Sequence, residues 1–218
     1  MIDESRISKH YSKRDLYKKI ESGLLELGTS LDSVDAENLG LVDEFHIGGA
    51  LATKFVADLL KLERGQTILD IGCGIGGPAR YMAKISGCRV NGIDLTESYI
   101  ETGIQLNTLV GLEDRVTLKQ GSALALPYRD HSFDGAYMIH VGMNIEEKGQ
   151  LMSEAFRVLN FSNYLVVFDV MKCKDTLVEY PLPWAERRED SAVDTIQSYK
   201  DALSKAGFNI LTLEDKNQ

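Results

Sequence analysis

The 218-residue sequence has few of the residues that hold secreted or metal-bound domains together. Its three cysteines, Cys73, Cys88 and Cys173, have no patterned spacing, which predicts free thiols in a reducing compartment rather than a disulfide framework. Four scattered histidines and the lack of a cysteine pair at ligand spacing argue against structural zinc. Since no pair of acidic residues stands out as a ligand set either, we expect no metal.

Long apolar runs and an excess of basic charge are also missing. No stretch approaches the ~20 apolar residues of a membrane span, and the polar N-terminus, MIDESRISKHYSKRD, has no apolar signal core. We therefore expect a cytoplasmic protein with no membrane span. The net charge of −9 argues against a nucleic-acid partner, because its phosphates would be repelled.

What the sequence does contain is an alternation of strand and helix patterns. Apolar periodicity predicts an early helix over residues 15–27 and a helix over 50–62 with Leu51, Phe55, Leu59 and Leu62 on one face. The polar residues 29–41 between them are expected to be a loop or a loosely helical connector. Strands are expected at 67–70, up to Asp94, and at 116–121, 133–140, 163–171 and 209–213, with helices between them. This order predicts an α/β fold with a mainly parallel, doubly wound sheet. We expect residues 49–218 to form this domain and residues 1–48 to form a helical lid over it.

The most informative stretch is QTILDIGCGIGGPARYMAKISGCRVNGIDLT, residues 66–96. An apolar run ends at Asp70, a glycine-rich turn follows, and a helix begins at Pro78, where the missing N–H of proline costs nothing. A second apolar run ends at Asp94, which is placed to accept hydrogen bonds from a ribose diol. The glycines let the backbone approach a ligand closely. The stretch therefore predicts an adenosine-type nucleotide site.

The identity of the nucleotide depends on Asp70. Gly72, Gly74 and Gly77 satisfy the spacing G-x-G-x-x-G, so a nicotinamide or flavin site is one interpretation. A carboxylate just before the loop would repel a pyrophosphate, whereas it would attract an ammonium group. S-adenosylmethionine has both an ammonium group and a ribose diol.

The chain also resembles a known family over roughly residues 11–213. DIGCGIGG followed by GIDLT is similar to the first two motifs of the class I S-adenosylmethionine-dependent methyltransferases. The strings VDEFHIGG, GIGGPARYMA and HVGMNI resemble a small-molecule branch with sarcosine/dimethylglycine N-methyltransferases and tocopherol or ubiquinone-type methyltransferases. The resemblance implies a Rossmann-like methyltransferase fold, S-adenosylmethionine as cofactor and a small-molecule methyl acceptor.

The resemblance also implies roles for particular residues. Asp94 would bind the ribose and Leu95 would pack on the adenine, while the backbone of Ala123 contacts it. Relatives commonly have Asp where this chain has Ser122, a weaker acceptor for the adenine amine. The remaining expected cofactor contacts are Tyr11, His46, Asp70, Gly72, Cys73, Gly74 and His140. We expect His140 to act as substrate contact or general base, because histidine titrates near neutral pH, and Asn144 to orient the substrate.

One departure from the family concerns the sheet. The family has seven strands, the last lying between the fifth and sixth, whereas only six are expected here, with no seventh strand before Gln218. An open edge leaves backbone groups unpaired, which keeps open a homo-oligomer or a subunit that needs a partner strand.

The predicted function is methyl transfer from S-adenosylmethionine to a small molecule, with an amine nitrogen of a glycine-, sarcosine- or dimethylglycine-like compound favoured by the resemblance. Carbon or oxygen transfer to a quinone, phenol or prenylated aromatic is the main alternative. Outside this class, a non-catalytic S-adenosylmethionine-binding subunit and an NAD-dependent oxidoreductase remain open. These hypotheses differ in ligand, so binding measurements separate them.

Overall fold

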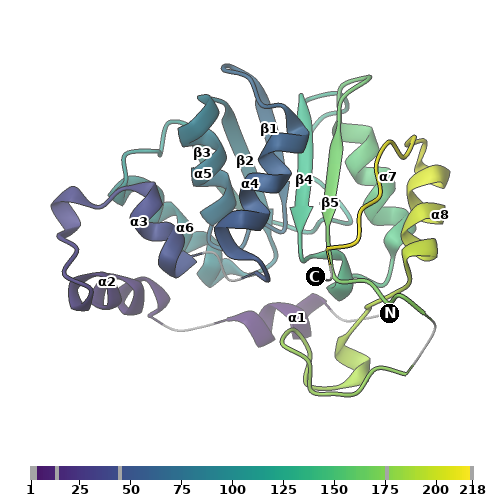
Figure 1. The fold of residues 1–218 in the computed structure, drawn as a ribbon, viewed down its shortest axis with the longest axis horizontal. Coiled ribbons are helices and arrows are strands. Elements are labelled where there is room, and N and C mark those ends of the chain that lie inside the picture. Colours follow the sequence, from purple (N-terminus) through teal and green to yellow (C-terminus); the bar gives the residue numbers. More distant parts are fainter. Residues whose placement is uncertain (1–3, 13–14, 44–45, 175–176, 217–218) are drawn as a thin grey trace.

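A computed structural model describes residues 4–12, 15–43, 46–174 and 177–216. Its centre is a five-stranded sheet with the order β3-β2-β1-β4-β5 (Figure 1). The strands are β1 (Thr67–Ile71), β2 (Arg89–Asp94), β3 (Val116–Gln120), β4 (Gly135–Ile139) and β5 (Leu165–Phe168). The α-helices are α1 (Glu4–Tyr11), α2 (Leu16–Glu26), α3 (Ala36–Asp43), α4 (Gly49–Leu60), α5 (Gly77–Ser86), α6 (Glu97–Leu109), α7 (Lys148–Val158) and α8 (Ile196–Ala206). Three short 3-10 helices lie at Leu31–Ser33, Gly142–Asn144 and Arg188–Asp190.

The predicted parallel sheet is confirmed, since every strand pair in it is parallel. The chain winds from β1 outward to β2 and β3, then returns to the other side of β1 to form β4 and β5. The carboxyl ends of β1 and β4 therefore flank the point where the winding changes direction. Ligands of doubly wound sheets bind at such a point.

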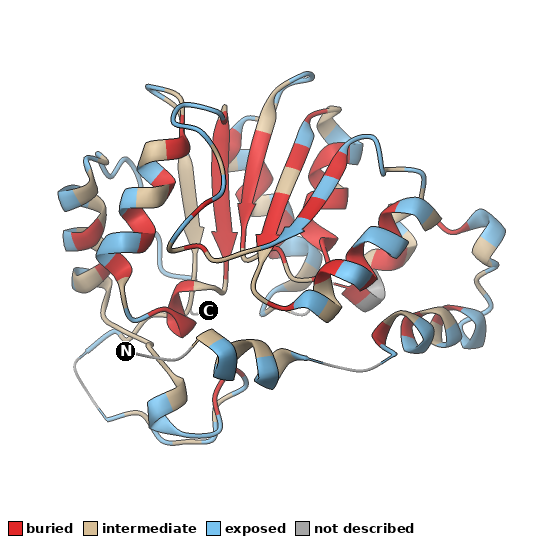
Figure 2. Ribbon diagram, turned by 180° about the vertical axis from the view of Figure 1, so that it is seen from behind, coloured by how far each residue is buried: buried red, intermediate tan, exposed pale blue. Residues whose placement is uncertain are grey.

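Helices cover both faces of the sheet. Side chains of α4, α5 and α6, including Val56, Met82 and Ile100, pack on one face, whereas α7 and α8 contribute Leu151 and Tyr199 to the other. Figure 2 shows that buried residues concentrate on the central strands and on the helix surfaces that meet them. Burial of each large apolar side chain stabilises the fold by roughly 1.5–3 kcal/mol, so the two layers hold the strand ends in place.

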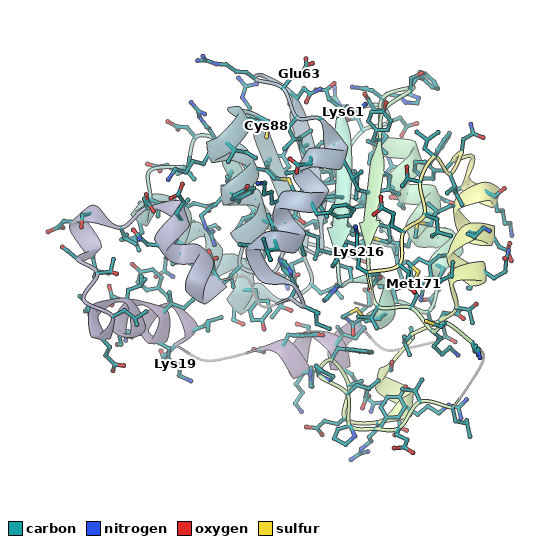
Figure 3. All side chains as sticks on the ribbon, viewed as in Figure 1. Lys19, Lys61, Glu63, Cys88, Met171 and Lys216 are labelled. Carbon is teal, nitrogen blue, oxygen red and sulfur yellow. The ribbon has the colours of Figure 1, made fainter. Side chains whose placement is uncertain are left out.

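The expected sixth strand at residues 209–213 is wrong. The described part of the chain has no strand after β5, and this segment is exposed and irregular. In the family order another strand separates the fifth from the sixth, so here a sixth strand has no neighbour with which to pair its backbone. Instead, the chain after α8 crosses in front of β5, and Lys216 lies 4.0 Å from the centroid of the Phe55 ring of α4 (Figure 3).

The connector at residues 29–41 is the helical one of the two forms expected for it, since it contains a 3-10 helix and most of α3. Helix α3 is held to α5 by a buried ion pair, with Asp43 Oδ2 2.6 Å from a guanidinium nitrogen of Arg80. The expected inner face of the helix at 50–62 is wrong, since Leu51 is 81% exposed while Ala52 and Val56 are buried. Small residues such as Ala52 let α4 approach its neighbours closely, which rotates the longer Leu51 outward.

Within the described residues, every helix is too short or too polar to cross a membrane.

Candidate active site

A cavity of about 250 Å³ opens at the carboxyl ends of β1, β2 and β4. Helix α1 passes beneath these strand ends in Figure 1 and contributes to the cavity wall. All the site residues predicted from the sequence except Ser122 line this one cavity: Tyr11, His46, Asp70, Gly72, Cys73, Gly74, Asp94, Leu95, Ala123, His140 and Asn144. The fold therefore brings together residues as far apart in the sequence as Tyr11 and Asn144, which are separated by 133 positions.

The glycine-rich turn shapes the floor of the cavity. Gly72 and Gly74 have φ values of +76° and +53°, in the left-handed region that favours glycine. The backbone N–H groups of Gly72 and Cys73 both donate to the carbonyl oxygen of Ile93, at 2.8 and 3.0 Å, which ties the turn to β2. A Cβ at Gly72 would collide with the side chain of Val141. This position therefore needs glycine for both conformation and space.

Asp94 is held in one orientation by its backbone neighbours. Its Oδ2 accepts from the N–H of Gly74 at 3.0 Å, and its Oδ1 accepts from the N–H of Thr96 at 2.8 Å. Burial raises the pKa of Asp94 above its ordinary value, and these two backbone bonds oppose the shift. Each carboxylate oxygen keeps a second acceptor site. The side chain can therefore receive two hydroxyls of a diol while it braces the turn.

Asp70 at the end of β1 is 2% exposed, and no described residue forms a hydrogen bond with its Oδ2. Burial, assisted by the charge of Asp94, raises its pKa from 3.8 to about 7. The Tyr137 hydroxyl is near enough to lower this pKa, although no hydrogen bond of normal geometry joins the two groups. A buried carboxylate oxygen without a partner is costly. Asp70 is thus suited to a cationic ligand group.

His140 follows β4 in a left-handed conformation, with φ of 55°. Its Nδ1 accepts from the N–H of Ile47 at 3.4 Å, and its ring stacks on Phe168 with centroids 5.5 Å apart. Burial, assisted by the nearby His46, lowers the pKa of His140 to about 4. The ring is therefore neutral at physiological pH. With Nδ1 accepting, the proton of this neutral ring is at Nε2, which makes His140 a hydrogen-bond donor toward a ligand.

Asn144 and Tyr11, which are 133 positions apart in the sequence, meet at the cavity. The Asn144 Nδ2 donates to the Tyr11 hydroxyl at 3.3 Å. Asn144 is 8% exposed, and its Oδ1 has no hydrogen-bond partner among the described residues. Burial raises the pKa of Tyr11, so its hydroxyl stays protonated. Asn144, which lines the cavity, therefore has an amide oxygen whose hydrogen-bonding capacity is unused by the described residues.

Ser122 is not part of the cavity wall. Its Oγ donates to Glu4 Oε1 of α1 and accepts from the N–H of Leu124 at 3.0 Å. Glu4 lines the cavity in its place, together with Ile7 from the same helix. Neither Glu4 nor Ile7 was predicted from the sequence, because α1 is short and polar and Glu4 lies 118 positions away from Ser122. Within ESRISKHY, Tyr11 was the one predicted site residue.

Apolar side chains also line the cavity. Met143 packs with Trp184 in a small cluster to which Tyr11 also contributes. Met143, Ile145, Pro183 and Trp184 all line the cavity. The indole nitrogen of Trp184 donates to Ser191 Oγ at 3.1 Å, which fixes the ring. The cavity therefore offers apolar contacts next to the polar pair of Tyr11 and Asn144.

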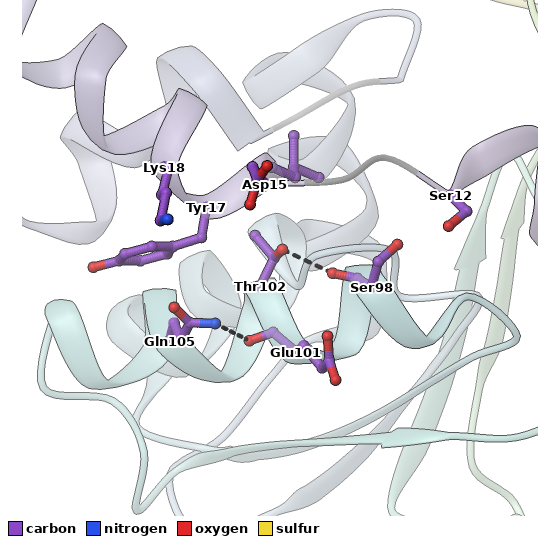
Figure 4. Close-up of a pocket in the computed structure, with 9 residues that line it drawn as sticks. Ser12, Asp15, Tyr17, Lys18, Ser98, Glu101, Thr102 and Gln105 are labelled. Atoms are coloured by element: carbon purple, nitrogen blue, oxygen red, sulfur yellow. Dashed lines mark hydrogen bonds between the residues drawn. The ribbon is translucent and has the colours of Figure 1, made fainter.

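A separate hollow lies between the start of α2 and α6 (Figure 4). Its polar side chains are used within α6, where Thr102 Oγ1 donates to the Ser98 carbonyl at 2.7 Å and Gln105 Nε2 donates to the Glu101 carbonyl at 3.3 Å. It lies away from the strand ends. Across the described ranges, no group of three or more His, Cys, Asp or Glu is arranged to hold a metal ion.

The sequence was compared with protein families and with known proteins. A family model described as a methyltransferase domain matches residues 69–167, from β1 to β5. The chain is 29% identical over 181 residues to methyltransferase GfsG of Streptomyces halstedii, covering 81% of this chain and 65% of that protein. It is 31% identical over 169 residues to phosphoethanolamine N-methyltransferase 1 of Zea mays, covering 78% of this chain and 33% of that protein.

Among solved structures, the [4+2]-cyclase SpnF superposes with a TM-score of 0.67 and 27% identity, covering 74% of this chain and 57% of that one. The chain thus spans less than two thirds of the length of each of these three proteins. The same scaffold is therefore found with more than one chemistry.

Proposed function

We propose that this chain, which carries a methyltransferase domain of the S-adenosylmethionine-dependent kind over residues 69–167, transfers a methyl group to an amine nitrogen of a small molecule. The observation that supports an amine is the buried Oδ1 of Asn144, which has no hydrogen-bond partner among the described residues. An unpaired buried acceptor costs about 1–3 kcal/mol. An amine N–H would supply the missing donor.

The residues at the strand ends fit S-adenosylmethionine. The unpartnered Oδ2 of Asp70 would take its ammonium group, Asp94 the ribose diol, and the backbone from Gly72 to Gly74 the rest of the amino-acid part. Leu95 would pack on the adenine. Bound S-adenosylmethionine supplies an electrophilic methyl group attached to a sulfonium.

The residues of the chain itself would align the acceptor with the methyl group and exclude water from the site. Asn144 would orient the acceptor N–H through Oδ1, and Tyr11 would cover the site from α1. His140 would act as a ligand contact that donates from Nε2, since its Nδ1 is engaged by Ile47. We further propose that residues 1–48 act as a lid over the domain formed by residues 49–218.

The cavity wall narrows the class of acceptor. Its described residues include the carboxylates of Glu4, Asp70 and Asp94, but neither lysine nor arginine. A phosphate or carboxylate on the acceptor would be repelled by these groups and would find no cationic side chain there. Amines without an anionic group are therefore favoured over the glycine derivatives that the sequence suggests.

A second candidate is methyl transfer to carbon or oxygen of an apolar acceptor. The observation that favours it is the apolar lining formed by Met143, Ile145 and Trp184. Such a lining suits a prenyl or aromatic group better than a small polar amine. The two candidates share a cofactor and differ only in the acceptor.

The test is methyl transfer from labelled S-adenosylmethionine to a panel of amines with and without a carboxylate, phenols and prenylated aromatics. We expect transfer to an amine that carries no anionic group and that arrives deprotonated, because the nitrogen lone pair forms the new bond to the methyl carbon as the carbon–sulfur bond breaks. Asn144→Ala should raise the KM for that amine at least about tenfold, with the Kd for the cofactor unchanged in calorimetry. The exposed Asn209→Ala serves as the matched control.

Transfer to phenols or carbon acceptors alone would refute the amine and favour the second candidate. Cofactor binding without transfer to any acceptor would instead favour a non-methylating role on this scaffold.

A further inference from the structure

The order of the strands sets the direction in which a bound nucleoside lies. Asp70 ends β1 and Asp94 ends β2, and β3 pairs with β2 on the side away from β1. In an S-adenosyl ligand, the amino-acid part and the base leave the ribose from opposite ends. With the ammonium at Asp70 and the diol at Asp94, the adenine must therefore point toward the carboxyl end of β3, where residues 121–123 lie.

At that end, the carboxylate on the cavity wall belongs to Glu4 of α1. The hydroxyl of Ser122 is committed on both sides, since it donates to Glu4 Oε1 and accepts from the N–H of Leu124. The Ser122 hydroxyl therefore has little capacity left to form a hydrogen bond with a base. Its hydrogen bond to Glu4 instead orients the Glu4 carboxylate. Each oxygen of that carboxylate has two acceptor sites, so Glu4 retains the capacity to accept further hydrogen bonds.

Further contacts hold Glu4 in position from within its own helix. Glu4, Ile7 and Tyr11 follow one another at helical spacing, and all three line the cavity. Arg6 forms an ion pair of 2.6 Å with Asp190. Ser8, four residues after Glu4 and on the same helical face, donates from Oγ to the Leu95 carbonyl at 3.4 Å. The helix therefore presents one face to the cavity and is anchored to the domain by both contacts.

We propose that Glu4 determines the specificity for adenine, by accepting a hydrogen bond from the exocyclic amine of the base while Ser122 orients its carboxylate. The proposal rests on the cofactor assigned under the proposed function. A carboxylate accepts from an amine and repels a carbonyl oxygen at the same ring position. Glu4 would thus favour an adenine over a 6-oxo purine, and binding of the base would hold α1 against the domain.

The experiment is calorimetric titration of the full chain with S-adenosylhomocysteine and with its 6-oxo analogue S-inosylhomocysteine. We expect the unmodified protein to bind the adenine compound at least about tenfold more tightly. Glu4→Ala should weaken binding of the adenine compound by about tenfold to a hundredfold and reduce the preference to near one. Glu26→Gln, on the exposed part of α2, is the matched control and should behave as the unmodified protein.

Glu4→Gln gives the sharper result, because its amide N–H can donate to a 6-oxo group. This variant should bind S-inosylhomocysteine more tightly than the unmodified protein does, which a merely structural role for Glu4 would not produce. If Glu4→Ala and Glu4→Gln keep the affinities and the preference of the unmodified protein while Asp94→Ala abolishes binding, the role of Glu4 is refuted and the cofactor assignment stands. Failure of the unmodified protein to bind S-adenosylhomocysteine overturns the cofactor assignment, and the role of Glu4 with it.

Discussion

Replacing Asp70 with asparagine should remove the pH dependence of cofactor binding. Burial raises the pKa of this carboxyl from 3.8 to about 7, and an ammonium group is stabilised by its ionised form. Below pH 7 the carboxylate must lose a proton before the ligand binds. The affinity should therefore rise about tenfold for each pH unit up to 7 and level off above it.

The assay is calorimetric titration with S-adenosylhomocysteine between pH 5.5 and 8.5, in two buffers that differ in ionisation enthalpy. The unmodified protein should release close to one proton per ligand at the low end and none at the high end. Asp70→Asn should bind weakly and with the same affinity at every pH, whereas the exposed Asp58→Asn should follow the unmodified protein. A flat pH profile in the unmodified protein, or full affinity in Asp70→Asn, would refute the role assigned to Asp70.

The same shift predicts an effect on stability without ligand. An acid whose pKa is raised by folding binds its proton more tightly in the folded state, so stability falls as the pH rises from 3.8 to about 7 and the penalty is complete above 7. The shift corresponds to as much as about 4 kcal/mol. Asp70→Asn should therefore unfold at higher urea concentrations than the unmodified protein at pH 8, and this advantage should vanish near pH 4.

Two further predictions concern the buried ion pair between α3 and α5 and the glycine-rich turn after β1. Asp43→Ala leaves the guanidinium of Arg80, which is 1% exposed, without its carboxylate, and should cost about 3–5 kcal/mol in urea unfolding. Lys84→Ala, which removes an exposed ion pair with Asp35, should cost under about 1 kcal/mol, and equal losses would contradict the assignment. Gly72→Ala should lower both the melting temperature and the affinity for S-adenosylhomocysteine, because its Cβ meets Val141. Gly111→Ala is the control, because Gly111 also has a positive φ but a Cβ there would meet no other atom. If both variants lose equal stability, the predicted collision between Cβ at position 72 and Val141 is refuted.

Local sequence was sufficient where a function is built from consecutive residues. The turn after β1 needs glycine at Gly72 for its φ of +76°, and the acidic residues Asp70 and Asp94 end their strands next to it. The carboxyl ends of parallel strands lie at the same edge of a sheet. The alternation of strands and helices was therefore enough to predict that these residues lie close together. The nucleotide-type cavity was therefore predictable from residues 66–96 alone.

Other features depend on contacts between distant segments. The segment at residues 209–213 has the apolar pattern of a strand, but it has no neighbouring strand with which to pair. Leu51 fits an inner helical face by spacing, yet packing against the sheet places Ala52 and Val56 there instead. In both cases periodicity describes what a segment can bury, and the surrounding elements decide what it does bury.

By itself, the sequence determined the class of fold, the turn that approaches the ligand and the two carboxylates beside it, because each follows from short-range geometry and strand order. The tertiary structure alone decided that Glu4 of α1 reaches the wall that Ser122 was expected to form, and that His140 accepts a backbone N–H and stays neutral. The physical reason is that burial and hydrogen-bond partners belong to the assembled molecule. The same serine or histidine therefore has a different proton affinity, and different donors and acceptors left free for a ligand, in each protein environment.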